Sequence, residues 1–381
     1  MKEKSFEQGP IRPPSEAGSL LFRFTRNCPW NKCTFCPVYK GKQFSRRSLE
    51  DIKSDIDTAA EIYEEILALS SSLGHGGSLT REVLEMAFTS GRLNDFHRQM
   101  ALWLYMGKGS VFIQDANSFV LPASVLVDAI AYLKQKIPGI RRITSYARSS
   151  TIAKMSVAEL REIRQAGLDR IHIGMESGSD RVLEFVRKGV SARRQIEAGR
   201  KVIEAGMELS EYFMPGLGGK ELSEDHARES ARVLNEINPH FIRLRTLRIP
   251  PRVPLFQDKQ SGRFTPLSDD ETVLEIRLFI SSLEVSSRLI SDHIMNLLEE
   301  VCGKLPEDKG AMLAVIDRYL DLPPEEKLLF RLGRRGGALR SLDELNDPGM
   351  RQRLQLAMKD MASETGGDLE KVITELADQY I

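Results

Sequence analysis

The sequence predicts an α/β fold: a partial or closed TIM-like barrel of six strand–helix units with a helical insertion and a helical C-terminal region. Three observations predict it. From Gly18 onward, short apolar runs alternate with amphipathic helical patterns. The first two runs are about eighty residues apart, far more than one crossover helix needs, which leaves room for the insertion. Beyond Leu267 the strand signals fade, and helical patterns continue to the end.

The six predicted strands are rich in Ile, Val, Phe or Leu, and most end near Gly, Pro, Asn or Ser. They are residues 19–25, 110–115, 142–147, 170–175, 208–214 and 241–247. Helical patterns lie between them; for example, Ser156 and Glu159 form a capping box, and Gly167 ends that helix. Such alternation indicates a parallel sheet covered by helices, and a doubly wound sheet is the alternative topology.

These patterns divide the chain into three parts. We expect an N-terminal extension over residues 1–17, a core barrel over residues 18–267 and a helical C-terminal region over residues 268–381. The helical insertion occupies residues 71–108, approximately, within the core.

Charge and hydropathy narrow the possible partners. The 54 basic residues equal the 54 acidic residues, so no overall basic excess favours nucleic acid or anionic lipid. The first residues lack the apolar stretch of a signal peptide, and no run approaches the roughly 18 apolar residues of a membrane span. We therefore expect a cytoplasmic protein.

Three of the four cysteines, Cys28, Cys33 and Cys36, lie on the loop that follows the first predicted strand. Clustered cysteines in a reducing compartment indicate a metal or redox site rather than disulfides. Three thiolates can hold three irons of a cubane cluster and leave the fourth iron open to a substrate.

Two alternatives remain open for this loop. Structural zinc normally has four ligands, but the fourth cysteine, Cys302, is distant in sequence and no histidine lies near the loop. A thioredoxin-like pair of Cys33 and Cys36 would leave Cys28 without a role.

Three clustered cysteines with Phe35 before the last resemble the radical S-adenosylmethionine (SAM) superfamily. The segment Glu176-Ser-Gly-Ser179 resembles the signature of its Elongator-like branch, which includes the methylthiotransferases. The resemblance covers residues 19–254, approximately. One departure is that four residues separate Cys28 from Cys33, where the superfamily usually has three.

The resemblance implies two cofactors: a [4Fe–4S] cluster on Cys28, Cys33 and Cys36, and SAM on the open iron. It places the SAM amino group near residues 114–118 and the ribose or amino group near Glu176. It places the carboxylate on Lys188, with Arg187 as the alternative, and the adenine on the backbone of residues 214–216. The implied SAM contacts are Phe35, Asp115, Asn117, Arg148, Glu176, Lys188, Met214, Pro215 and Gly216.

The activity that the resemblance implies is reductive cleavage of SAM to a 5′-deoxyadenosyl radical, which abstracts hydrogen from a substrate under anaerobic conditions. An electron donor such as flavodoxin or ferredoxin is the implied partner. We expect the substrate to be a small metabolite or a lipid. The alternatives are a tRNA- or protein-modifying radical enzyme and a non-enzymatic module stabilised by zinc.

Overall fold

The structure, a computed structural model, describes residues 4–379. Its main sheet has eight strands in the order β1-β4-β5-β6-β7-β8-β9-β10. The strands are β1 (Leu20–Arg23), β4 (Ser110–Gln114), β5 (Arg142–Ala147), β6 (Leu168–Glu176), β7 (Glu208–Phe213), β8 (Phe241–Leu244), β9 (Arg288–Ile290) and β10 (Gly303–Lys304). The short strands β2 (Thr25–Arg26) and β3 (Ser45–Arg46) form a separate antiparallel pair.

The strand order decides between the predicted topologies. From β1 to β8 each strand of the main sheet lies beside the next one in sequence, as in a barrel and unlike a doubly wound sheet. The pairs β1–β4, β4–β5, β5–β6, β7–β8 and β8–β9 are parallel, whereas the short β10 is antiparallel to its neighbour β9. Because β1 and β10 are the two edges, the sheet is open. The predicted α/β fold is therefore confirmed in its partial form.

Two details differ from the prediction. The first predicted strand divides into β1 and β2, because β2 pairs with β3 rather than with the main sheet. The region after residue 267 is not helical throughout, since it contributes β9 and β10. Strands of three and two residues are too short to show the alternation by which a strand is recognised.

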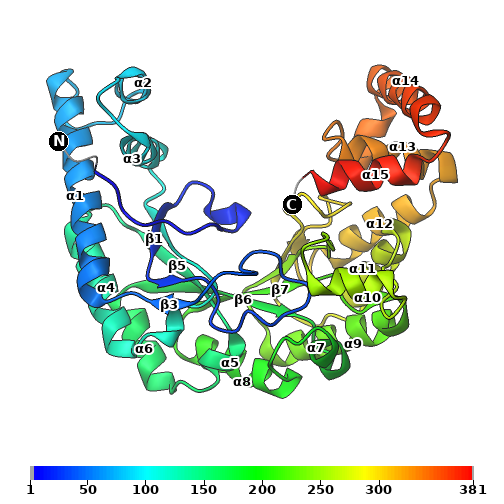
Figure 1. The fold of residues 1–381 in the computed structure, drawn as a ribbon, viewed down its shortest axis with the longest axis horizontal. Helices are drawn as coiled ribbons and strands as arrows, with labels where there is room; N and C mark the ends of the chain where they lie inside the picture. Colours follow the sequence, from blue (N-terminus) through cyan, green and yellow to red (C-terminus); the bar gives the residue numbers. More distant parts are fainter. Residues whose placement is uncertain (1–3, 380–381) are drawn as a thin grey trace. The chain divides into compact units, whose positions relative to one another are not determined.

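The chain divides into two compact units. The first comprises the residues up to Asn31, Gly41–Ile173 and Glu197–Leu209. In this unit, α1 (Leu49–Ser72), α4 (Ala123–Lys136) and α6 (Val157–Ala166) pack side by side (Figure 1). The predicted insertion forms α2 (Arg81–Thr89) and α3 (Asp95–Met106), which pack on each other and on α1.

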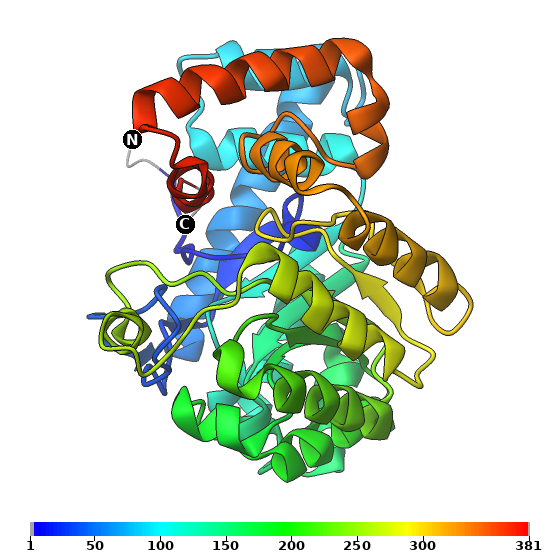
Figure 2. The same cartoon turned by 90° about the vertical axis from the view of Figure 1, so that its right-hand side faces the viewer.

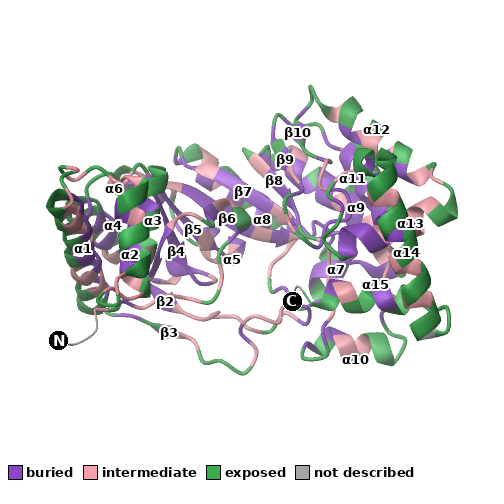
Figure 3. Cartoon of the chain, turned by 90° about the horizontal axis from the view of Figure 1, so that it is seen from above, coloured by how far each residue is buried: buried purple, intermediate pink, exposed green. Residues whose placement is uncertain are grey.

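Local sequence explains why α1 forms and which face it buries. The Ser48 side chain accepts the Asp51 backbone N–H at 3.0 Å and so caps the helix. Ile52, Ile56 and Ile62 recur at helical spacing and are fully buried, whereas the opposite face is exposed (Figure 3).

The N-terminal segment is part of the first unit. The Gly9 N–H donates to Gln114 Oε1 at 2.7 Å, and Gln114 Nε2 donates to the carbonyls of Gly9 and Ile11 at 2.9 and 3.1 Å. Glu16 is fully buried and pairs with Arg142 at 2.9 Å. The part of the predicted extension around Gly9 therefore lies at the carboxyl end of β4, whereas Glu16 pairs with the first residue of β5.

The second unit comprises Lys32–Lys40, Gly174–Ile196 and the described residues from Ser210 onward. In it α9 (Gly219–Ile237) packs on α11 (Asp269–Ser281), which packs on α12 (Lys309–Leu320). The helices α13 (Pro324–Arg335), α14 (Pro348–Thr365) and α15 (Leu369–Asp378) pack together (Figure 2). Their shared core contains Leu332, Val372 and Ile373.

Aromatic stacking attaches α9 and α11 to the sheet. The Phe213 ring on β7 stacks on Phe279 of α11, with centroids 3.9 Å apart, and on His226 of α9, with centroids 4.7 Å apart. The remaining helices are α5 (Ser149–Ile152), α7 (Asp180–Phe185), α8 (Ala192–Glu204), α10 (Pro254–Gln260), η1 (Pro14–Glu16), η2 (Ser118–Val120) and η3 (Leu342–Asn346). Within residues 4–379, every helix is too short or too polar to cross a lipid bilayer.

Candidate active site

The first cysteine lies on a tight turn in the first unit. Cys28 is half-buried, and its Sγ accepts the Asn31 backbone N–H at 3.4 Å. Asn27 and Asn31 have φ values of 66° and 45°, in the left-handed region that asparagine tolerates. Their side-chain amides donate to the carbonyls of Gln43 and Lys42. The residues between Cys28 and Cys33 therefore include an ordered turn, which directs one backbone N–H donor at Cys28 Sγ.

Two predicted SAM contacts in this unit connect neighbouring loops. The Arg148 guanidinium lies 5.1 Å from the Trp30 ring centroid, a cation–π contact with the cysteine loop. Asn117 is fully buried; its Oδ1 accepts the Arg148 backbone N–H at 3.3 Å, and its Nδ2 donates to Thr151 Oγ1 at 2.7 Å. Asn117 thus links the loops that follow β4 and β5, a role that sequence reasoning missed.

Asp115, another predicted SAM contact, is held in place by an ion pair with Arg23. Its side chain is fully buried, its φ is 69°, and its carboxylate pairs with the Arg23 guanidinium, which also contacts Glu7 at 3.0 Å. The chain's own arginine therefore balances the negative charge predicted to receive the SAM amino group.

The second half of the cysteine loop belongs to the second unit. The Thr34 N–H donates to the Val186 carbonyl at 3.0 Å, and the Thr34 carbonyl accepts the Leu255 N–H at 3.0 Å. Cys33 and Cys36 are half-buried and pack against an apolar cluster around Phe35. The buried members of this cluster are Phe35, Val182, Val186, Met214, Leu217, Val253, Leu255 and Phe264.

Three predicted SAM contacts come together beside these cysteines. Lys188 Nζ lies 2.9 Å from Glu176 Oε1 and 5.8 Å from the Phe35 ring centroid. The Lys188 and Glu176 side chains are only 10% and 13% exposed, so their pairing is only weakly screened by water. A cation, an anion and an aromatic ring therefore meet at the carboxyl end of β6.

A glycine leaves the space for this pair. A Cβ on Gly174 would lie 2.2 Å from Glu176 Oε1 and 3.1 Å from Lys188 Nζ. Both contacts are with the ends of flexible side chains, so an added methyl group would displace the pair rather than the backbone.

Glu211 on β7 lies near the same charges and is almost fully buried. Burial raises the pKa of Glu211 well above its usual range; the charge of Glu176 raises it further, whereas Lys188 lowers it. The balance favours the uncharged acid, which does not compete with Glu176 for Lys188.

The loop predicted to contact adenine is held from two sides. The Met214 N–H donates to the Glu176 carbonyl at 3.0 Å. The Gly216 N–H donates to Glu275 Oε1 on α11 at 2.6 Å, and the Ser223 hydroxyl donates to Glu275 Oε2 at 2.6 Å. Gly216 has a φ of 86°, a conformation that glycine adopts without strain. Sequence reasoning missed Glu275, because its partners are 52 and 59 residues away.

Glu275 predicts a pH dependence of stability. Burial raises its pKa from 4.5 to about 7. Its stabilising contribution is complete below about pH 4.5 and is lost as the pH rises through about 7, a difference of about 3 kcal/mol. We expect Glu275→Gln, whose amide oxygen can accept the Gly216 N–H and whose NH2 group can donate to Ser223 Oγ, to remove this loss. Urea unfolding of both proteins at pH 5 and pH 8 measures the difference; parallel changes in the free energy of unfolding would contradict it.

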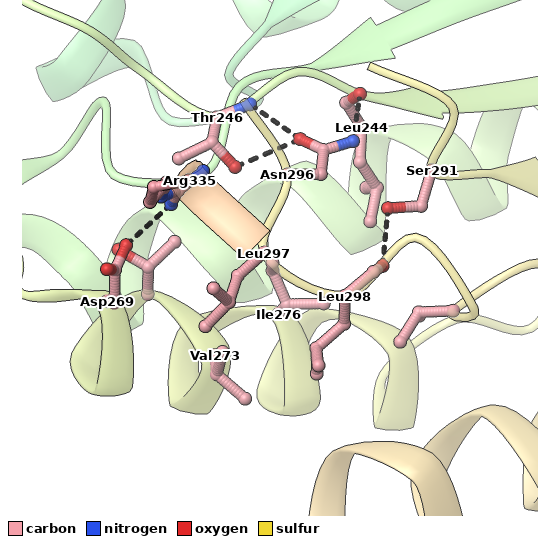
Figure 4. A pocket seen from close by; sticks show the side chains of 12 residues that line it. Leu244, Thr246, Asp269, Val273, Ile276, Ser291, Asn296, Leu297, Leu298 and Arg335 are labelled. Carbon is pink, nitrogen blue, oxygen red and sulfur yellow. Dashed lines mark hydrogen bonds and ion pairs between the residues drawn. The ribbon is translucent and has the colours of Figure 1, made fainter. Parts of the chain in front are cut away.

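A pocket elsewhere in the second unit contains no predicted site residue. Its lining includes Leu244, Thr246, Asp269, Val273, Ile276, Ser291, Asn296, Leu297, Leu298 and Arg335 (Figure 4). Its polar groups pair with one another: Asp269 with Arg335 at 2.7 Å, and Thr246 with Asn296 at 3.0 Å. We therefore interpret this pocket as structural.

The open sheet is mostly parallel, with a cysteine loop after its first strand and polar residues at later strand ends, and barrel enzymes place their active sites at these strand ends. The family model of the radical SAM superfamily matches residues 94–231. Over these residues the chain is similar to the radical SAM superfamily, which supports the predicted cofactors, a [4Fe–4S] cluster and SAM. The matched range begins after the cysteine loop, so the individual ligands remain predictions.

The relatives agree with the predicted branch. The mitochondrial tRNA methylthiotransferase CDK5RAP1 of Rattus norvegicus is 25% identical over 60% of this chain and 36% of its own length. The tRNA uridine(34) acetyltransferase of Methanocaldococcus jannaschii is 20% identical over 30% of this chain and 21% of its own length. The chain thus spans about a third or less of these relatives. Among solved structures, methylornithine synthase (PylB) matches with a TM-score of 0.43 and 14% identity, over 78% of this chain and 68% of its own.

The thiols suit an iron–sulfur cluster chemically. None of the four cysteines forms a disulfide; three are half-buried, and Cys302 is exposed. Cys28 Sγ accepts a backbone N–H, and Cys33 and Cys36 pack against apolar side chains. Hydrogen bonds to the sulfurs and exclusion of solvent both tune the reduction potential of an iron–sulfur cluster. In the described part of the chain, no three His, Cys, Asp or Glu side chains already form a metal-binding group, so the ligand assignment rests on the sequence.

Proposed function

We propose that the protein is a radical SAM enzyme that holds its cluster on Cys28, Cys33 and Cys36 and binds SAM beside Lys188 and Glu176. The contact of Lys188 with both Glu176 and Phe35 carries the proposal, because it joins the predicted SAM-binding charges to the segment between two of the cysteines.

When bound, the cluster and SAM supply one-electron chemistry that removes a hydrogen atom from an organic substrate. The protein's own residues bind and orient. Lys188 pairs with the SAM carboxylate, Glu176 accepts hydrogen bonds from the ribose or the amino group, and the backbone of residues 214–216 supports adenine. The apolar cluster around Phe35 covers one side of Cys33 and Cys36.

Metal analysis and product analysis test the proposal. We expect anaerobically purified, reconstituted protein to contain iron and sulfide and to form 5′-deoxyadenosine when given SAM and a strong reductant. Stoichiometric zinc without iron or sulfide would instead indicate the zinc-stabilised module.

For the substrate, we propose a small metabolite or a lipid, because the net charge of zero gives no general attraction to a polyanion. The second candidate is tRNA, favoured by the names of two relatives. A tRNA affinity that falls steeply with salt concentration would favour the second candidate. Unchanged weak binding from low to physiological salt would favour the first.

The proposed compartment and electron donor follow from the chemistry of cysteine-held iron–sulfur clusters. A cluster held by cysteine requires a reducing compartment, which the cytoplasm provides, and protection from oxygen. A small electron-transfer protein such as flavodoxin or ferredoxin is the proposed reductant.

A further inference from the structure

Helix α9 contacts both segments of the second unit that are predicted to hold SAM. His226, near the middle of α9, is fully buried between them. Its Nε2 lies 3.0 Å from the Met214 carbonyl oxygen, and its Nδ1 lies 2.8 Å from Ser177 Oγ. Met214 begins the glycine-rich segment after β7, and Ser177 follows Glu176 after β6. One side chain therefore connects the two segments.

The chemistry of these partners determines the protonation of the ring. A carbonyl oxygen can only accept, so Nε2 must carry the hydrogen that is donated to Met214. Burial lowers the pKa of His226 to about 4, so the ring is neutral near pH 7 and Nδ1 accepts from the Ser177 hydroxyl. One ring nitrogen thus donates and the other accepts, and no other common side chain places a donor and an acceptor at these two positions.

Further contacts with α9 fix the same segment after β6. The Gly178 N–H donates to Ser230 Oγ at 2.8 Å, and the Ser179 hydroxyl donates to the Asp225 carboxylate. A Cβ on Gly178 would lie 2.3 Å from the Glu229 carbonyl oxygen and 2.6 Å from the Ser230 Cα, so only glycine allows this approach. In the sequence Glu176-Ser-Gly-Ser179, the last three residues contact α9, whereas Glu176 contacts Lys188.

The geometry points to His226 as a positioning residue for SAM: it holds the segment after β6 and the segment after β7 at a fixed separation. SAM can then bind to Glu176 and to the backbone of residues 214–216 without either segment having to become ordered first. The inference rests on the proposed SAM site. It adds a residue of α9 that touches neither SAM nor the cluster, and it gives Ser177, Gly178 and Ser179 a docking role rather than a ligand-binding role.

Preorganisation of this kind lowers the cost of binding rather than the barrier of the chemical step. In His226→Ala, the Met214 carbonyl and the Ser177 hydroxyl lose their buried partner, and the two segments remain joined by the Met214 N–H to Glu176 carbonyl bond but are held less rigidly. We expect the KM for SAM to rise about ten-fold or more, while kcat at saturating SAM changes by less than about two-fold.

Two conservative variants separate the two bonds. His226→Gln places an amide N–H near the position of Nε2 and so retains donation to Met214, whereas His226→Asn places an acceptor near the position of Nδ1 and retains the bond from Ser177. Both variants should have a KM for SAM between those of wild type and His226→Ala. Val233→Ala is the matched control, because it also removes a fully buried side chain from α9 but has no hydrogen bond to either segment.

Hydrogen exchange provides a readout that requires neither cofactor. In the protein without cluster or SAM, amides in residues 174–180 and 212–219 should exchange faster in His226→Ala than in Val233→Ala. A KM and exchange rates in His226→Ala no different from those in Val233→Ala would overturn the inference while leaving the SAM site intact. A wild-type protein that neither binds nor cleaves SAM would instead overturn the proposed function, and with it the inference.

Discussion

Replacing Cys36 with alanine is expected to lower 5′-deoxyadenosine formation by ~10³-fold or more, to the protein-free background. Two remaining thiolates cannot hold three irons, so a cubane cluster with one open iron cannot be retained. The measurements are iron and sulfide content after anaerobic reconstitution, followed by chromatography of the nucleoside product. Cys36 packs against the apolar cluster around Phe35, so the folding of the variant should be checked by circular dichroism.

Cys302→Ala is the matched control. Cys302 is exposed and lies far from the loop in sequence, so its removal should leave iron content and product formation unchanged. If Cys36→Ala formed as much product as the wild type, Cys36 would not be a cluster ligand. If Cys302→Ala lost iron while Cys36→Ala kept it, the three-cysteine assignment itself would be wrong.

Gly174→Ala is expected to weaken SAM binding by about 10- to 100-fold with little change in the free energy of unfolding. The new methyl group would lie 2.2 Å from Glu176 Oε1, so the carboxylate must turn away from Lys188. Both charges stay in the site but are no longer in position for the ligand. Titration of SAM against the reconstituted protein measures the affinity, and urea unfolding measures the stability.

Gly310→Ala controls for the general effect of changing glycine to alanine. A Cβ on Gly310 meets no atom within 4 Å, and the residue lies on α12, where alanine favours the helix. This control should bind SAM normally. Unchanged SAM affinity in Gly174→Ala would show that the Lys188–Glu176 geometry does not set binding.

The parts of the fold that the sequence predicts are those encoded locally. The strand over residues 142–147 appears with those limits, because its apolar run is bounded by turn-forming residues. β9 and β10 were missed, since strands this short are defined by their partners rather than by their own pattern.

The residues of the candidate site follow the same rule: those close together in the sequence could be predicted, and those brought together only by folding could not. Cys28, Cys33 and Cys36, and likewise Glu176 and Lys188, are close in sequence, so their spacing already indicates chemistry. His226 lies 49 residues from Ser177, and Glu275 lies 59 from Gly216, so only the folded chain brings them together. A histidine near the middle of a helix was the sole local signal for His226, and it is equally typical of a structural residue.

The ion pair of Lys188 and Glu176 also sets the charge balance of the proposed SAM site. Two mostly buried groups of opposite sign neutralise each other, so the amino acid end of SAM, which is a zwitterion, can exchange partners with them without leaving either group unpaired. An analogue with only a carboxylate would leave Glu176 unmatched, and one with only an amine would leave Lys188 unmatched. The site should therefore discriminate against singly charged analogues by the penalty for an isolated buried charge, even where their shape is right.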